Sequence, residues 1–356
     1  MAQHFLLSAK ARTLSVLEVA RMSDDEAYAV FKEMRFEANG GEPFCPRCGV
    51  DAIYTYKVRR EFKCKYCDHR FTLTSGTLFR GRKMAIKDIL AAVLMFVNGV
   101  NGNAALRMSR DLCCSYKTAF VLVSKLRRAQ AALQIQHQLT GDVDIDGLWI
   151  GGYIRQENMV ADRTSDGRKQ FSGKRRSIVT MRERRPGGRS RAVVVPNEKA
   201  AVEVIKKVVA KTAHVFTDEQ SAFSKLYLHF REHSTVNHSR GLVVNGVHTN
   251  LVEAQHTRIR RGERGVYLHI SGNHAQRFAH EFSWRDDFRR LSNGQQFRKL
   301  LGSAATISPD LELVGYWQKR PKSVLDLNRR RALKARTRQV KGVKPTPIPY
   351  TERASG

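Results

Sequence analysis

The sequence has few acidic residues for its basic content. Its 356 residues include 33 Asp and Glu against 63 Lys and Arg, which gives a formal net charge of +30. A charge of this sign and size favours a polyanionic partner such as nucleic acid. The excess is concentrated in two blocks, with 11 Lys and Arg in residues 163–191 and ten in residues 319–341. The alternative is a solvated basic surface that only keeps the protein in solution.

The sequence also lacks long hydrophobic runs. No apolar stretch approaches the roughly 20 residues that a membrane-spanning helix needs, and the segment "DILAAVLMFVNGV" ends too early. The first residues, "MAQHFLLSAKARTLS", have neither the apolar core nor the cleavage site of a secretory signal. We therefore expect an intracellular protein with no membrane partner.

Cysteine is scarce too, but four of the six cysteines form a pattern. They make two Cys-x-x-Cys pairs, Cys45 with Cys48 and Cys64 with Cys67, with 15 residues between the pairs. This spacing is typical of a tetrahedral zinc site on a ribbon of strands. Disulfides are the alternative, and the missing export signal argues against them. Four protein ligands leave no open position, so the predicted zinc is structural.

Residues 84–132 read as three helices. The segments "MAIKDILAAVLMFVNGV", "NAALRMSRDL" and "SYKTAFVLVSKLRRAQAAL" have apolar residues at helical spacing. A short helix followed by a tight turn and a longer basic helix is the outline of a helix-turn-helix, in which Ser115, Tyr116 and Lys117 would reach base edges. A plain three-helix bundle would show the same pattern.

Between residues 140 and 300 the pattern changes to strands. "VDIDGLWIGG" alternates like a half-buried strand and places Asp144 and Asp146 on one face. Three strands, a helix, a fourth strand, a helix, a fifth strand and a last helix follow one another, which is the order of a ribonuclease-H-like domain. We expect the first and fourth strands to be neighbours, so that Asp146 and Asp218 converge with Glu253 of the later helix.

Three converging carboxylates repel one another unless cations lie between them. Carboxylate oxygens suit Mg²⁺ or Mn²⁺, and two such ions can activate an attacking hydroxyl and stabilise the leaving oxygen of a phosphodiester. Asp146, Asp218 and Glu253 are therefore the predicted metal ligands. Asp144 is expected either to support them or to be a solvated residue of the strand.

These segments together resemble the zinc-ribbon-bearing DDE transposases of bacterial insertion sequences, the ISXO2-like subgroup. The resemblance runs from about Ser23 to Arg290 and includes "FCPRCG", "FKCKYC", "DIDGLWIGG", "VFTDEQSAF", "VNHSRG", "VHTNLVEAQHTRIRRGERGVYLHIS" and "EFSWR". It implies a catalytic triad of Asp146, Asp218 and Glu253. It also implies cutting at element ends and joining of the freed 3′-hydroxyl to target DNA, in the bacterial cytoplasm at the nucleoid.

The sequence departs from the family pattern at three places. Gly147 stands where the family commonly has an acid, and Arg260 where it often has Lys, so that phosphate clamping would survive better than proton transfer. The segment "EAQHT" lacks the aromatic residues usual after the catalytic Glu. His238 and His248 are either buried structural histidines or groups that orient a carboxylate or hold the scissile phosphate, and we include His248 in the candidate catalytic set.

The expected organisation is α/β with several domains. A helical segment (1–40), the zinc ribbon (41–80), a helix-turn-helix-like segment (81–135), the ribonuclease-H-like domain (140–300) and a basic, partly disordered tail (301–356) follow in order. The basic blocks are poor in aromatic residues, so we expect Arg329, Arg330 and Arg331 to bind duplex phosphates without sequence preference. The partners would be double-stranded element ends and target DNA, bound by a homo-oligomer.

Two other functions stay open at this stage. The first is a DNA-binding regulator built on an inactive nuclease fold, which the intact triad disfavours. The second is a nuclease that cuts without joining, which the sequence does not separate from a transposase.

Overall fold

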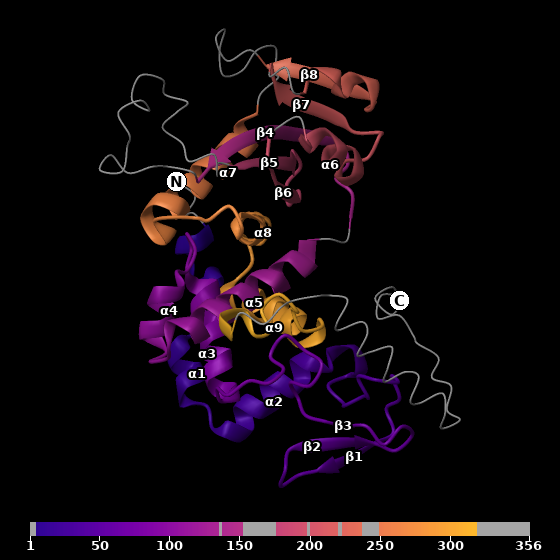
Figure 1. The fold of residues 1–356 in the computed structure, drawn as a ribbon, viewed down its shortest axis with the longest axis vertical. Helices are drawn as coiled ribbons and strands as arrows, with labels where there is room; N and C mark the ends of the chain where they lie inside the picture. The colour runs from indigo at the N-terminus through magenta and orange to yellow at the C-terminus, as the bar shows by residue number, and fades with distance from the viewer. Residues whose placement is uncertain are drawn as a thin grey trace.

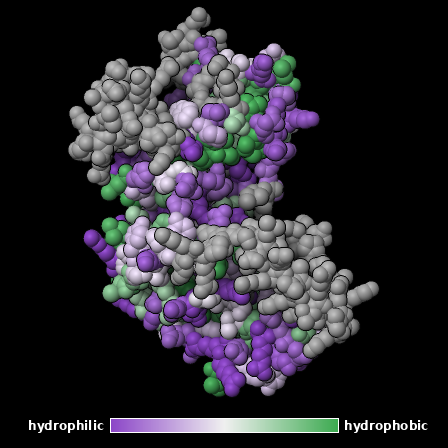
Figure 2. Space-filling view, in the orientation of Figure 1, coloured by the Kyte–Doolittle hydropathy of each residue, from purple (hydrophilic) through white to green (hydrophobic). Residues whose placement is uncertain are grey.

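The computed structural model describes residues 5–134, 137–151, 176–197, 200–219, 223–236 and 249–318. Figure 1 shows a helical body that carries a small three-stranded sheet at one end, and a larger sheet with its own helices at the other. Among the described residues, no helix has the length and apolar character to cross a membrane. In the view of Figure 2, hydrophilic residues dominate the coloured surface of the helical body, and hydrophobic residues gather beside the larger sheet.

The helical body forms from both ends of the described chain. Its helices are α1 (Val16–Arg21), α2 (Asp24–Arg35), α3 (Ile86–Asn98), α4 (Ala105–Asp111), α5 (Tyr116–Gln134) and α9 (Asn293–Thr306). The short 3-10 helices η1 (Phe5–Leu7), η2 (Ala9–Ala11) and η3 (Glu37–Asn39) accompany them. Ser23 and Glu26 form the capping box that starts α2, which its Ser-x-x-Glu pattern indicates.

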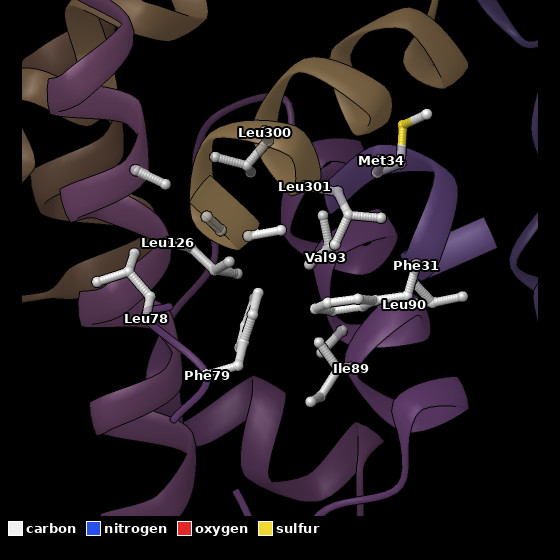
Figure 3. Close-up of a cluster of buried hydrophobic side chains, with 14 of the residues drawn as sticks. Phe31, Met34, Leu78, Phe79, Ile89, Leu90, Val93, Leu126, Leu300 and Leu301 are labelled. Atoms are coloured by element: carbon white, nitrogen blue, oxygen red, sulfur yellow. The ribbon is translucent and has the colours of Figure 1, made fainter. Parts of the chain in front are cut away.

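One hydrophobic core holds this body together. Figure 3 shows side chains of α2, α3, α5, α9 and the segment around Leu78 pointing into the same interior, with Phe31, Val93 and Leu301 among them. The small sheet adds Phe62 and Phe71 to this cluster. Burial of this kind contributes about 1.5–3 kcal/mol for each large side chain, so the small sheet and the helices stabilise one another.

The placement of α9 differs from the sequence-based division at residue 300. The helix runs through that boundary from Asn293 to Thr306, and it packs on α2, α3 and α5 of the helical body. Its apolar face, which includes Phe297, Leu300 and Ala304, is buried in the N-terminal core. Helical periodicity predicted neither this long-range packing nor the contribution of α9 to the N-terminal core.

The larger sheet has five strands in the order β6-β5-β4-β7-β8. They are β4 (Asp142–Ile150), β5 (Arg176–Glu183), β6 (Ser190–Val195), β7 (His214–Asp218) and β8 (Glu232–Val236). The first three strands are antiparallel, while β7 pairs parallel with both β4 and β8. The expectation that the first and fourth strands are neighbours is therefore confirmed by the pairing of β4 with β7.

Alternation along β4 gives the sheet two different faces. Val143 and Ile145 point to a core shared with α6 (Ala201–Val208). Leu148 and Ile150 point to the opposite core, formed with α7 (Asn250–Gly262) and α8 (Ala275–Asp287). The π-helix η9 (Glu263–Tyr267) follows α7 directly. Since side chains alternate along a strand, Asp144 and Asp146 lie on the face that α7 and α8 cover.

The expected helix after the fourth strand is shorter than the sequence pattern suggested. The structure has the 3-10 helix η8 over Ser224–Leu228, while residues 220–222 lie outside the described part of the chain. Phe223 and Leu226 are both buried. A spacing of three residues puts two side chains on the same side of a 3-10 helix, so a tight turn suffices to bury this pair.

A buried ion cluster joins α5 of the helical body to α8. Glu281 accepts hydrogen bonds from Arg127 Nε at 2.6 Å, from Arg285 Nη2 at 2.8 Å and from the Tyr267 hydroxyl at 2.9 Å. The Arg127 guanidinium also lies 4.0 Å from the ring centroid of Phe278. Burial alone would raise the pKa of Glu281, but the two guanidinium groups outweigh it and the pKa falls. The carboxylate is therefore ionised at neutral pH.

Candidate metal centre and active site

The four paired cysteines meet at the small sheet. Its strands are β1 (Ile53–Tyr56), β2 (Glu61–Cys64) and β3 (Arg70–Phe71), all antiparallel. The four sulfur atoms lie within 4.8 Å of one another, with 3.6 Å from Cys45 to Cys67 and 3.6 Å from Cys48 to Cys64. A tetrahedral zinc with bonds of about 2.3 Å places its sulfur ligands about 3.8 Å apart. The sulfur positions therefore fit a structural Zn²⁺.

Tight turns present these sulfur atoms. Gly49 N–H donates to the Cys45 carbonyl at 2.9 Å, and Asp68 N–H donates to the Cys64 carbonyl at 3.1 Å. Gly49 has a φ of +76°, a conformation that glycine adopts without strain. Burial raises the pKa of the Cys45 thiol to about 12. Burial has the same tendency at Cys64, but backbone N–H groups from Cys67 and Tyr66 outweigh it and lower that pKa.

Two of the predicted catalytic carboxylates lie where β4 loses its parallel neighbour. Residues 142–145 of β4 pair with residues 214–217 of β7, so Asp146 and Asp218 occupy the next position on each strand. Neighbouring strands are about 4.8 Å apart. Each carboxylate accepts the N–H of the following residue, Asp146 from Gly147 at 2.6 Å and Asp218 from Glu219 at 2.7 Å. Both side chains are half-buried.

Helix α7 crosses the sheet over Asp146. His256 Nδ1 lies 3.3 Å from Asp146 Oδ2, and Nε2 lies 3.2 Å from the Thr180 hydroxyl. Thr180 is the residue opposite Asp146 on β5, so the imidazole ring connects the two side chains of one cross-strand pair. A neutral ring with its proton on Nδ1 can donate to the carboxylate and accept from the hydroxyl. Only 5% of His256 is exposed.

Glu253 lies one helical turn before His256 on the same side of α7. Its Oε1 accepts a hydrogen bond from the Thr249 hydroxyl at 3.0 Å. Glu253 is therefore on the side of α7 that His256 turns toward Asp146. Within the described chain, however, the one group of ligand atoms gathered within 4.8 Å is the cysteine cluster. Asp146, Asp218 and Glu253 are therefore not within that spacing of one another.

His256 is a residue that the sequence interpretation missed. It treated "EAQHT" as a departure from the family pattern and selected His248, which lies outside the described residues together with His238. The available signal was the Glu-x-x-His spacing of Glu253 and His256, which places both side chains on one side of a helix. What the sequence could not provide is the register that sets His256 over Asp146.

Asp144 is a buried ion-pair partner, and its interpretation as a solvated residue is wrong. The side chain is fully buried and lies 2.5 Å from Arg184 Nε. The Arg184 guanidinium in turn lies over the ring of Phe216, the residue of β7 that pairs with Asp144. Burying a carboxylate without a cation is costly. The pair therefore stabilises the beginning of β4, two residues before Asp146.

The remaining predicted residues are spread over the molecule. Arg260 is exposed on α7, seven residues after Glu253 and therefore on nearly the same side of the helix. Ser115 accepts the Thr118 N–H at 3.2 Å and caps α5, while Tyr116 and Lys117 are exposed in its first turn. Arg329, Arg330 and Arg331, with the rest of 319–356, lie outside the described residues, as does 163–175 of the first basic block.

The chain matches two family models. The model of the ISXO2-like transposase domain covers residues 138–287, and that of the transposase zinc-ribbon domain covers residues 22–70. The chain is also similar to an uncharacterized protein in transposable element ISH50 of Halobacterium salinarum, with 24% identity over 284 residues. That alignment spans 73% of this chain and 91% of the relative. No solved structure gives a significant match.

Proposed function

Because this chain belongs to the ISXO2-like transposases that carry a zinc ribbon, we propose that it binds insertion-sequence ends, cleaves them and joins the freed 3′-hydroxyl to target DNA. The observation that carries the proposal is the position of Asp146. It lies level with Asp218 where β7 ends, and His256, which follows Glu253 by one turn of α7, lies 3.3 Å from it.

Asp146, Asp218 and Glu253 would hold Mg²⁺ or Mn²⁺. Three negative charges at one edge of a sheet repel one another, and hard divalent cations with oxygen preference offset that repulsion. When bound, two such ions would stabilise the attacking and the leaving oxygens of the phosphodiester. In this proposal His256 orients Asp146 through its Nδ1–H, and Thr249 orients Glu253 through its hydroxyl.

Positive side chains would position the DNA around these carboxylates. Arg260 projects from the same side of α7 as Glu253, and its guanidinium can hold a phosphate with two parallel hydrogen bonds. His248 remains a proposed contact to the scissile phosphate. The zinc ribbon would also contact DNA, through basic side chains that are exposed on it: Lys57, Arg59, Lys65 and Arg70.

Two finer structural assignments belong to the same proposal. The strand order β6-β5-β4-β7-β8, with one antiparallel half and one parallel half, supports a ribonuclease-H-like domain that begins near residue 140 and ends before α9. The short α4, the turn after it and the longer α5 support a helix-turn-helix-like unit over 81–135. In that unit Ser115, Tyr116 and Lys117 would contact bases.

The proposal extends to the assembly and its location. Joining both ends of one element to a target requires two active sites near each other, so we propose a homo-oligomer on DNA. Its substrates would be the element ends and target DNA of the bacterial nucleoid, in the cytoplasm. The helical segment 1–40, the ribbon 41–80 and the basic block 319–341 would contribute DNA contacts around the catalytic domain.

The experiment that tests this function separates binding, cutting and joining. Purified full-length protein is incubated with labelled element-end duplexes, a supercoiled target plasmid and Mg²⁺, and the products are resolved on gels. A transposase gives nicked ends and covalent end–plasmid joints, and it gives neither with EDTA. A nuclease gives nicks without joints, and a regulator gives a shifted duplex with no new strand ends. Either of the last two results would refute the proposal.

A further inference from the structure

A groove opens beside the first turns of α5. Its cavity has a volume of about 370 Å³, and four segments of the chain line it: residues 79–84, Ile89 of α3, one side of α5, and residues 313–317. The floor is apolar, with Phe79, Ile89 and Leu122 among its residues. Nothing in the proposed chemistry at Asp146 uses this groove.

The C-terminal wall of the groove is held in place from α8. Arg277 Nη1 lies 2.8 Å from Asp310 Oδ2. His274 is the residue before α8, and its Nε2 lies 3.1 Å from the Tyr316 hydroxyl. Gly315 has a φ of +68°, which turns the chain so that the 3-10 helix η10 (Tyr316–Gln318) lies against α5. These contacts therefore hold the C-terminal wall of the groove in place against α5 and α8.

Trp317 forms the aromatic side of the groove. Its ring contacts those of Phe120, Tyr116 and Tyr316 at interplanar angles of 71°, 66° and 82°. These edge-on contacts fix the indole plane, and 39% of the residue remains exposed. Lys117 Nζ lies 5.8 Å from the ring centroid, so a cation accompanies the aromatic surface.

The charged lining of the groove has one sign. Arg82, Lys83, Lys117 and Lys125 line it, and no carboxylate does. Burial lowers the pKa of Lys125, and the nearby Asp310 carboxylate partly opposes this shift. The groove therefore has an indole ring and an apolar floor beside its cationic side chains, a combination that the basic blocks of the sequence lack.

This combination distinguishes between the two forms of DNA. Duplex phosphates need only cations, because paired bases keep their faces stacked inside the helix. An unpaired strand offers base faces to an aromatic ring and phosphates to cations at the same time. We propose that the groove binds an unpaired DNA segment, with one base against Trp317 and an adjoining phosphate on Lys83. The inference rests on the proposed function, since it takes DNA as the substrate.

The test measures binding of two fluorescent probes to the full-length protein, a single-stranded oligothymidine 12-mer and a duplex of equal length. Trp317→Leu keeps an apolar side chain but removes the aromatic face, and Trp317→Phe restores an aromatic face. The matched control is Tyr227→Ala, because Tyr227 is 62% exposed on η8, outside the groove. We expect Trp317→Leu to weaken single-strand binding by about fivefold or more, the low end for one stacked base. Trp317→Phe should recover most of the affinity.

Duplex binding separates the possible outcomes. The proposal requires that Trp317→Leu change duplex affinity by less than about twofold, and that Tyr227→Ala change neither affinity. Equal losses on both probes, or unchanged single-strand affinity in Trp317→Leu, would overturn it while leaving the transposase assignment intact. If the wild-type protein bound neither probe, the proposed function itself would fail.

Discussion

Replacing Glu281 by Gln should destabilise the protein strongly, because this carboxylate compensates two buried cations. Glu281 is fully buried, and Arg127 and Arg285 are 4% and 10% exposed in their side chains. Removing one partner of a buried ion pair typically costs about 3–5 kcal/mol, since the other charge stays buried without compensation. Here two guanidinium groups would lose their counter-charge, so we expect a loss at the upper end of that range.

Urea denaturation of the zinc-loaded full-length protein, followed by circular dichroism, measures this loss. The matched control is Glu33→Gln. Glu33 forms a contact of the same type and length, 2.6 Å to Arg298, but both side chains are 55% exposed. Exposed pairs contribute about 0–1 kcal/mol, so this control should shift the midpoint only slightly. Equal effects of the two substitutions would refute the argument from burial.

Three further predictions concern pH, zinc and DNA. Burial, with Arg128, Arg191 and Arg277 nearby, lowers the pKa of His280 from 6.5 to about 4. Between pH 4 and pH 6.5 the native state therefore binds fewer protons than the unfolded state. Stability should therefore fall by up to about 3 kcal/mol as the pH drops from 6.5 to 4, and pH-dependent melting of His280→Gln should show a shallower fall. Cys64→Ser should reduce zinc content by elemental analysis and loosen the helical core that Phe62 shares, while amide exchange in β4–β7 stays slow. Joint removal of Arg329, Arg330 and Arg331 should weaken binding to element-end and random duplexes equally in salt titrations. Lys117→Ala should instead reduce the preference for element ends over random DNA. The reverse pattern would contradict this division of roles.

The sequence was informative where one local pattern decides the outcome. The two Cys-x-x-Cys pairs predicted the sulfur cluster, and the alternation around Asp146 predicted a strand with one polar pair on its inner face. The order of elements predicted that β4 and β7 are neighbours, which the pairing confirms. Each of these inferences depends on spacing within one short segment, residues 45–67 or 142–150, or on chain order alone.

The sequence was not informative where packing between distant segments decides the outcome. Phe297 and Leu301 of α9 show helical periodicity, but only the tertiary structure tells which core they enter. The pairing of Asp144 with Arg184 depends on the register of β4 and β5. The contact of His256 with Asp146 depends on where α7 crosses the sheet. In each case the relevant distance joins residues far apart in the chain.

The central claim is that Asp146, Asp218 and Glu253 act as one metal-dependent unit. It is tested most directly by the rate of end joining in Mg²⁺ for Asp146→Asn, Asp218→Asn and the double variant, with Glu219→Gln as the adjacent exposed control. Residues that work as a unit lose nearly all activity singly, and the double variant loses little more. We predict this result, with normal duplex binding throughout and normal joining by Glu219→Gln. Normal joining by either single variant, or losses that simply multiply in the double variant, would contradict the account.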